Sequence, residues 1–452
     1  MSPDRRRFLR HAAALTPLAV GSTLTAGLGL ALPQLAQAAD YRALMVIFLK
    51  GGYDGNDMLV PRDGGYADYQ RARPNLALRK DELVPIAGYD GGSLGMHPAF
   101  APLRPLYEQG RMAWVANVGP LVRPASVGQV LANQAEVPPF LMSHSEQVNI
   151  VQGWNPAESL NGWGGRGMEE LPSDLVGKLP VTSFAFDNTL VTGLRSRMTL
   201  ASSNSNRYWG SADLGNPNNK WTQIVESMGQ LQSKNLVENE FARSLGASFA
   251  DTVALTLADS KAGALRTAFP DSQLARDLAY VARLMPVFKS EGVRRQLFFT
   301  DFGSFDTHVS QRGDDAGRAM DVQMDWVARA LAAWDAELRA TGMDREVLTL
   351  VMTEFGRTLQ PAGAGTDHAW GNHWFALGAP VRGGRVHGRM PSLVLGGADD
   401  GDPYKKGRWV PDYASDQFGA TAMQWLGLPA DKLVAVFPNL ANFPGKTVPY
   451  LA

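Results

Sequence analysis

The sequence of 452 residues contains no cysteine. This absence excludes disulfides, zinc sites built from thiolates, iron–sulfur clusters and thiol nucleophiles. A basic excess is missing too, since 43 Lys and Arg against 44 Asp and Glu leave a net charge of −1. We therefore expect no nucleic-acid partner. The sequence also lacks the composition of a disordered chain. Hydrophobic residues make up 45% of it, which is enough for a substantial core.

The first 38 residues have the features of an export signal. A basic segment, Asp4-Arg5-Arg6-Arg7-Phe8-Leu9, has the form of a twin-arginine (Tat) signal, and a weakly apolar stretch follows over residues 12–32. Ala36-Gln37-Ala38 then matches a signal-peptidase site. Polar residues and glycines interrupt the apolar stretch, so a permanent membrane anchor is not expected. We predict export by the Tat translocase, cleavage after residue 38, and a periplasmic or secreted protein; a basic start to a buried helix is the alternative.

Residues 39–452 are predicted to form one α/β domain. Continuous apolar runs predict buried strands, and apolar residues spaced three and four apart predict helices. Their alternation favours a mostly parallel sheet with helices on both faces, a three-layer α/β/α sandwich. Residues 188–270 depart from this pattern and are predicted to be a helical insertion or cap. The expected strands are 42–49, 111–118, 181–186, 295–301, 347–353 and 374–378, and the expected helices are 271–290, 317–340 and 417–426.

Acidic and histidine side chains follow several predicted strands. Asp54 follows the first strand, and Glu354 ends the strand at 347–353. Parallel strands present their carboxyl ends at one edge of a sheet, where ligands bind, so we expect these side chains to collect there. Carboxylates suit Mg²⁺, Ca²⁺ or Mn²⁺, and imidazoles favour Zn²⁺. The candidate ligands of a divalent metal are Asp54, Asp306, His308, Glu354, Asp367 and His368.

Each of these signals also has a structural interpretation. The glycine-rich segment around Asp54 could be only a tight turn. Ser143 could be an N-cap, with Glu146 three residues later completing a capping box. Arg357 could bind an anion or pair with Glu354. Taken singly, each signal is more often structural, but their convergence on one predicted edge favours a polar site.

Several motifs resemble the Tat-exported bacterial family known as domain of unknown function 1501. The resemblance covers essentially the whole mature chain, and its most specific parts lie around Asp306 and Glu354. The matching segments are Leu44–Asp57, Met96-His97-Pro98, Ser143-His144, Phe305-Asp306-Thr307-His308, Thr353-Glu354-Phe355-Gly356-Arg357-Thr358, Asp367-His368 and Asp416-Gln417-Phe418-Gly419-Ala420-Thr421.

That family resembles the alkaline phosphatase and sulfatase superfamily, whose α/β/α core holds one or two divalent metals. The resemblance implies that Asp54 is the first-strand metal ligand and that Ser143 occupies the position of the nucleophile. Phe355 stands where the superfamily usually has a ligating histidine, so a single-metal site is easier to build than a two-zinc site. The pairs Asp306–His308 and Asp367–His368 would supply further ligands.

Two classes of function are consistent with these features. The first is an exported, metal-dependent hydrolase of a phosphate or sulfate ester, in a small molecule or a polymer. Ser143 would be the nucleophile, His144 a general acid or base, and Arg357 would bind a non-bridging oxygen. The second is a non-catalytic periplasmic binding or assembly protein on the same fold, because fold alone does not determine function.

Overall fold

The computed structural model describes residues 40–87, 92–153, 161–196, 198–203, 216, 218–313 and 317–452. These residues all fall within one unit that spans residues 39–452. The predicted export signal, residues 1–38, lies outside the described residues. In the part of the chain that is described, no helix combines the length and the apolar character needed to cross a membrane.

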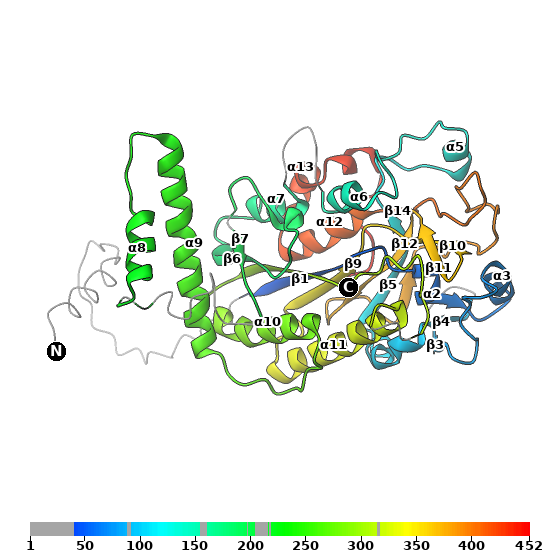
Figure 1. The fold of residues 1–452 in the computed structure, drawn as a ribbon, viewed down its shortest axis with the longest axis horizontal. Coiled ribbons are helices and arrows are strands. Elements are labelled where there is room, and N and C mark those ends of the chain that lie inside the picture. Colours follow the sequence, from blue (N-terminus) through cyan, green and yellow to red (C-terminus); the bar gives the residue numbers. More distant parts are fainter. Residues whose placement is uncertain are drawn as a thin grey trace, which may run out of the picture. The chain divides into compact units, whose positions relative to one another are not determined.

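A mostly parallel sheet forms the middle layer (Figure 1). Its strands are β1 (Arg42–Leu49), β5 (Met112–Gly119), β6 (Val176–Ser183), β7 (Met198–Leu200), β8 (Arg295–Phe302), β9 (Val347–Met352), β12 (Asn372–Leu377), β13 (Arg385–His387) and β14 (Tyr413–Ala414). Their order is β13-β5-β12-β9-β1-β8-β6-β7, and β14 also pairs with β5. Only β12 among them runs antiparallel to its neighbours, β5 and β9.

The central strands form where the sequence has continuous apolar runs. β1 and β9 are buried along nearly their whole length, as expected for parallel strands covered on both faces. Leu49 at the end of β1 pairs with Phe302 at the end of β8, and Phe48 pairs with Met352 of β9. The carboxyl ends of these three strands are therefore level, and the loops that follow them leave from one edge of the sheet.

Helices cover both faces of the sheet, which confirms the predicted α/β/α sandwich (Figure 1). α10 (Gln273–Ser290) and α11 (Met320–Thr341) lie on one face. The other face carries α6 (His144–Val151), α7 (Trp163–Glu169), α12 (Ser415–Leu426) and α13 (Leu433–Val436). The apolar stripe that predicted α11 is buried against the sandwich, and Gly342 ends this helix in the left-handed conformation.

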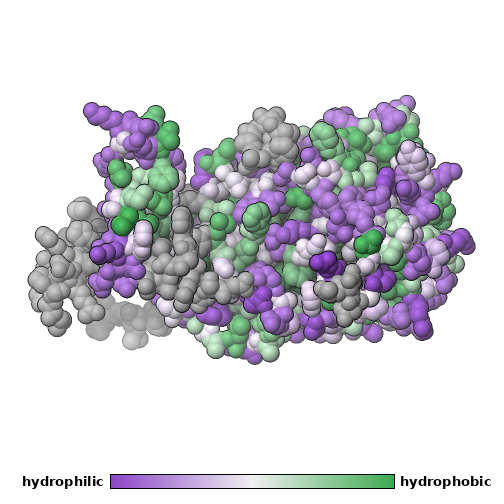
Figure 2. Space-filling view, viewed as in Figure 1, coloured by the Kyte–Doolittle hydropathy of each residue, from purple (hydrophilic) through white to green (hydrophobic). Residues whose placement is uncertain are grey.

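The segment 188–270 is only partly helical. It contains β7, which pairs in parallel with β6 and so extends the main sheet. Two helices follow, α8 (Lys220–Gly229) and α9 (Leu236–Lys261), and they pack together where Gly229 meets Gly246. Apolar side chains gather on the exposed surface of this helical pair, among them Trp221 and Phe241 (Figure 2). A role as a cap stays a prediction.

Shorter elements fill the connections. β10 (Arg357–Ala362) and β11 (Gly365–His368) form a separate hairpin that pairs Arg357 with His368. This hairpin was not predicted from the sequence, because its strands lack a continuous apolar run. The others are α2 (Gly55–Met58), β2 (Leu59–Pro61), α3 (Gly65–Ala72), β3 (Val84–Ile86), β4 (Leu94–Met96), η1 (Pro98–Leu103), α4 (Arg104–Glu108), α5 (Val127–Leu131), η2 (Thr189–Val191), η4 (Ala430–Lys432) and η5 (Pro438–Asn442).

Candidate metal centre

The loops after β1, β8 and β9 meet at the level edge of the sheet. Gly51, with φ +105°, lets the loop after β1 pack directly against the loop after β8, because a Cβ atom there would lie 2.4 Å from the backbone nitrogen of Asp306. The start of α6 and the end of β11 bring His144 and His368 to the same place. Five distant segments of the chain therefore build one polar site.

Three imidazoles surround one carboxylate oxygen in this site. Oδ1 of Asp306 lies 3.0 Å from Nε2 of His308, 3.1 Å from Nε2 of His368 and 3.4 Å from Nε2 of His144. The Nε2 atoms of His308 and His368 are 3.0 Å apart. His144, Asp306 and His368 have the spacing of a group that could hold a metal ion. We call Asp306 and the three histidines the imidazole cluster.

Hydrogen bonds at Nδ1 of His144 and His368 determine that Nε2 of each ring faces the cluster. Nδ1 of His144 donates to Oε1 of Glu354 at 2.9 Å, and Nδ1 of His368 donates to the carbonyl of Met142 at 2.8 Å. A neutral imidazole that donates through Nδ1 keeps a lone pair on Nε2. Both Nε2 atoms are thus directed, as metal ligands are, toward the carboxylate of Asp306.

This arrangement fits a bound cation better than it fits hydrogen bonding alone. Lone pairs on His144 and His368 repel each other and the charge of Asp306 unless positive charge lies between them. The buried Nε2 of His144 has no hydrogen-bond partner within the described residues. Zinc bonds of about 2.0–2.1 Å place tetrahedral ligands about 3.3–3.4 Å apart, close to the separations in the cluster. The donor set therefore suits a borderline divalent ion.

The surroundings of the cluster shift its pKa values in different directions. The hydrogen bond from His144 to Glu354 raises the pKa of His144, whereas burial lowers the pKa of His368. Burial alone would raise the pKa of Asp306, but the hydrogen bond and charge of Arg357 outweigh it and hold that pKa well below its usual range. Asp306 is therefore ionised, and His368 favours the neutral form that a ligand requires.

Asp367 lies at the border of the cluster. Together with His308 and His368 it forms a second group of ligand spacing, which shares His368 with the first. One of its oxygens accepts from the backbone of His368 at 2.8 Å, and the other lies 3.3 Å from Arg408. Asp367 is thus placed beside the cluster, and its carboxylate is partly occupied by these contacts.

Glu354 and Arg357 lie behind the imidazole cluster. Glu354 is buried and accepts hydrogen bonds from His144, from the backbone of Gly51 at 2.7 Å and from Thr353 at 2.8 Å. It orients His144 instead of joining the group of ligand spacing. Arg357 donates to Asp306 at 2.6 Å and to four backbone carbonyls, so the alternative that it pairs with Glu354 is wrong.

Asp54 is fully buried and belongs to a different cluster. Its carboxylate accepts from both terminal nitrogens of Arg73, at 2.5 and 3.0 Å, and from the side chain of Gln311 at 2.7 Å. Asp57 lies next to it and is paired with Arg73 and Arg312. The guanidinium of Arg73 supplies the positive charge that a metal ion was expected to supply, so we leave Asp54 out of the proposed metal ligands. We call these residues the arginine cluster.

Ser143 lies immediately before α6, but its hydroxyl is hydrogen-bonded to Glu146 and is not positioned as the predicted nucleophile. It donates to the carboxylate of Glu146 and lies 3.4 Å from the hydroxyl of Ser145. Its side chain makes no capping hydrogen bond, so the predicted capping box is wrong. Ser143 is the N-cap by position only, and in this rotamer it is not directed at the imidazole cluster.

Three further residues contribute to the site, although none of them was predicted to do so. Phe355 packs its ring 4.7 Å from that of His144 and 4.6 Å from that of His368, which closes one side of the cluster. The carbonyl of Met142 orients His368. Gln147 donates to the carbonyl of Glu354. Phe355 was noted only as a missing ligand, and nothing in the local sequence marks the other two.

Comparison with known proteins identifies the family. Residues 41–406 match the family described as "Protein of unknown function (DUF1501)", and the chain belongs to this family. Among curated proteins, none matches the chain.

Solved structures show weaker likenesses. One is the PsFucS1 sulfatase from Pseudoalteromonas sp., with 11% identity and a TM-score of 0.36, over 88% of this chain and 70% of that one. Another is the lipoteichoic acid synthase LtaP from Listeria monocytogenes, with 8% identity and a TM-score of 0.35, over 90% and 76% of the two chains.

Proposed function

We propose that this protein is an exported hydrolase of phosphate or sulfate esters that depends on one divalent metal ion held by the imidazole cluster. The observation that carries the proposal is the convergence of the Nε2 atoms of His144 and His368 on the ionised carboxylate of Asp306. His308 would complete the ligand set from the solvent side, since its side chain is 45% exposed.

Residues behind the cluster would keep the ligands in place. Glu354 holds the His144 ring, and Arg357 anchors Asp306 through the 2.6 Å hydrogen bond. Phe355 excludes water from one side of the imidazoles. Such preorganisation lets a site bind a metal ion without paying for rearrangement.

A metal ion in the cluster would attract an anionic substrate by its own charge. The arginines nearby are already matched by carboxylates, because Arg357 pairs with Asp306 and Arg408 lies between Asp367 and Asp402. The attraction would therefore come from the divalent ion.

A bound divalent ion would polarise the ester and lower the pKa of a ligated water or hydroxyl. Ser143 could act as a nucleophile only after its hydroxyl leaves Glu146 and rotates toward the cluster. We therefore propose Ser143 as a conditional participant, and His144 as a ligand in place of a general acid or base.

A non-catalytic role in binding or assembly is the second candidate. It is favoured by the orientation of Ser143 toward Glu146 and by the use of Arg357 for backbone carbonyls. In that case the metal ion would hold a ligand or a partner, and no ester would be hydrolysed.

Metal content is the first measurement. The mature protein, purified after native export and without chelators, would be analysed by inductively coupled plasma mass spectrometry. We expect about one equivalent of metal per chain in the wild type and almost none in Asp306→Asn. Asp271→Asn is a matched control, because this carboxylate is 94% exposed and belongs to neither group of ligand spacing.

Activity toward 4-nitrophenyl phosphate and 4-nitrophenyl sulfate would follow on the metal-loaded protein. Turnover that is lost in Asp306→Asn and kept in Asp271→Asn supports the hydrolase. Bound metal without turnover of a broader ester panel supports the second candidate. A wild type that binds no metal after incubation with Zn²⁺, Mn²⁺, Mg²⁺ and Ca²⁺ would reject the metal centre itself.

A further inference from the structure

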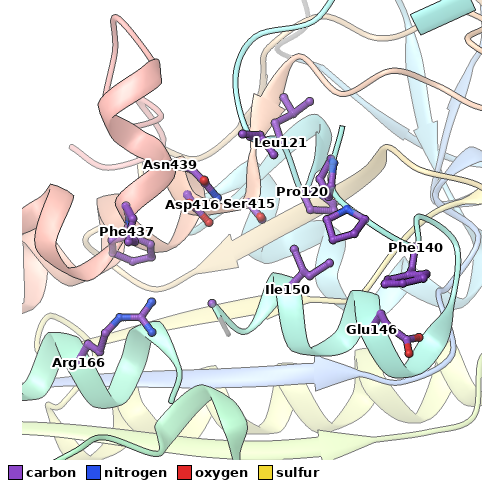
Figure 3. Close-up of a pocket in the computed structure, with 15 residues that line it drawn as sticks. Pro120, Leu121, Phe140, Glu146, Ile150, Arg166, Ser415, Asp416, Phe437 and Asn439 are labelled. Atoms are coloured by element: carbon purple, nitrogen blue, oxygen red, sulfur yellow. The ribbon is translucent and has the colours of Figure 1, made fainter. Parts of the chain in front are cut away.

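A cavity of about 390 Å³ lies behind α6, on a part of the protein that the metal centre does not use. Figure 3 shows Ile150 and Glu146 of α6 on one side and Asp416 and Asn439 on the other. Phe140 lies at one end, next to the segment that leads into α6. A cavity of this size is in the range of small-molecule sites.

Most of the wall is apolar. It is formed by the residues after β5, by the segment before α6 and by the turn after α13, and prolines make much of it rigid. The apolar members are Pro120, Leu121, Val122, Pro138, Pro139, Phe140, Ile150, Phe437 and Pro438. A ring or a short aliphatic chain placed here would lose contact with water over most of its surface.

One end of the cavity carries a buried carboxylate. Asp416, in the first turn of α12, is 7% exposed and hydrogen-bonded to Asn439. Burial raises the pKa of Asp416 to about 6, so at neutral pH it carries its charge at a cost. The motif that begins at Asp416 is part of the family resemblance, yet it makes no contribution to the imidazole cluster.

Arg166 is the cation among the charged lining residues. Its charge lowers the pKa of Asp416 and so opposes the effect of burial, while its guanidinium donates to the carbonyls of Val436 and Asn161 and to the side chain of Asn161. Glu146 adds a second carboxylate on the opposite side of the cavity (Figure 3). The charged side chains among the described lining residues are thus two carboxylates and one guanidinium, and a ligand that brings donors and positive charge balances them.

We propose that this cavity binds a small apolar organic cation, in which an ammonium or amidinium group is joined to an aromatic or aliphatic body. The cation pairs with Asp416, and the body fills the space between the prolines, Phe140 and Ile150. The inference does not depend on the proposed hydrolase, because no residue of the imidazole cluster lines the cavity.

The test uses benzamidine as the probe and isothermal titration calorimetry as the measurement. The mature protein is titrated at pH 8, in the presence of EDTA, so that metal binding plays no part. We expect one molecule of benzamidine per chain, at least tenfold weaker binding in Asp416→Asn, and at least tenfold weaker binding of the neutral benzyl alcohol to the wild type.

Two further variants make the result decisive. Ile150→Trp places bulk in the cavity from the opposite wall and should abolish binding even if Asp416→Asn fails to fold. Glu136→Gln, at an exposed ion pair with Arg123, should leave binding unchanged. The proposal is overturned if the wild type does not bind benzamidine, or if folded Asp416→Asn and Ile150→Trp bind it as the wild type does. Loss of ester hydrolysis alone would leave it intact.

Discussion

Two clusters of charged and polar side chains lie near the ends of β1 and β8, and they balance their charge in different ways. In the arginine cluster, Asp54 and Asp57 are fully buried and paired with Arg73. In the imidazole cluster, Asp306 is 38% exposed, and three Nε2 atoms surround its oxygen. In the first cluster arginines are the cations beside the carboxylates, whereas in the second Asp306 has both Arg357 and three imidazoles, two of which direct lone pairs toward it.

The difference shows how burial and pairing separate a structural charge from a functional one. A buried carboxylate without a cation is very costly, so the fold supplies Arg73 permanently. A carboxylate at an open edge can exchange its partner with solvent, which a metal site requires. Substitutions in the two clusters, and at one buried imidazole outside them, test this difference.

The largest effect is expected from removing the internal cation. Arg73→Met leaves Asp54 and Asp57 buried without their shared partner, and we expect a loss of about 3–5 kcal/mol in the free energy of unfolding, measured with urea. Arg71→Ala breaks only the exposed pair with Asp68 and should change it by less than about 1 kcal/mol. Equal effects of the two variants would mean that the arginine cluster does not need its cation.

Acid should weaken the fold through a buried imidazole outside both clusters. Burial lowers the pKa of His373 to about 4, against about 6.5 in the unfolded chain. Between these values only the unfolded chain takes up the proton, so this contribution is complete above pH 6.5 and is lost as the pH falls toward 4. The full effect is about 3 kcal/mol.

His373→Gln isolates this contribution. We expect the stability of the wild type, relative to this variant, to fall by about 3 kcal/mol between pH 7 and pH 4, as measured by urea unfolding in EDTA. Parallel pH profiles for the two proteins would contradict the assignment.

Metal should stabilise only the fold with an intact imidazole cluster. Zn²⁺ at 100 times its dissociation constant is expected to raise the free energy of unfolding of the wild type by about 2.7 kcal/mol. Asp306→Asn should show no such gain, because the anionic ligand is gone while the shape is kept. A gain of equal size in both proteins would place the metal elsewhere.

The smallest effect is expected from the residue that orients a ligand. Glu354→Gln keeps the shape of the side chain but weakens its hold on His144, so the metal affinity should fall by about 10–100-fold. Competition with a chromophoric chelator measures this change. Glu136→Gln serves as the surface control, and an unchanged affinity in Glu354→Gln would remove Glu354 from the site.

The sequence predicted much of the sheet and little of the hairpins. β1, β8 and β9 matched the predicted strands to within a residue or so, because parallel strands buried on both faces need continuous apolar runs. β10 and β11 have no such run, and their pairing depends on contacts with Gly407 and Thr307 from other segments. The orientation of β12 could not be predicted, because an apolar run does not specify direction.

The residue types of the candidate site were predicted better than their roles. Asp306, His308 and His368 were named as ligands and do lie together. Glu354, also named as a ligand, lies behind His144, and Asp54 pairs with Arg73, a residue that no local pattern connects to it. Whether the group binds metal stays a prediction that the proposed measurement tests.

The sequence by itself determined the α/β layering and the set of polar residues that leave the carboxyl edge, because apolar periodicity and the polar residues that follow each apolar run are local properties of the chain. Only the tertiary structure decided that Asp54 pairs with Arg73, while Asp306 is surrounded by three imidazoles in addition to Arg357. Arg73 and His368 reach their partners from distant segments, and the energy of each pairing depends on burial and distance, which no local motif contains.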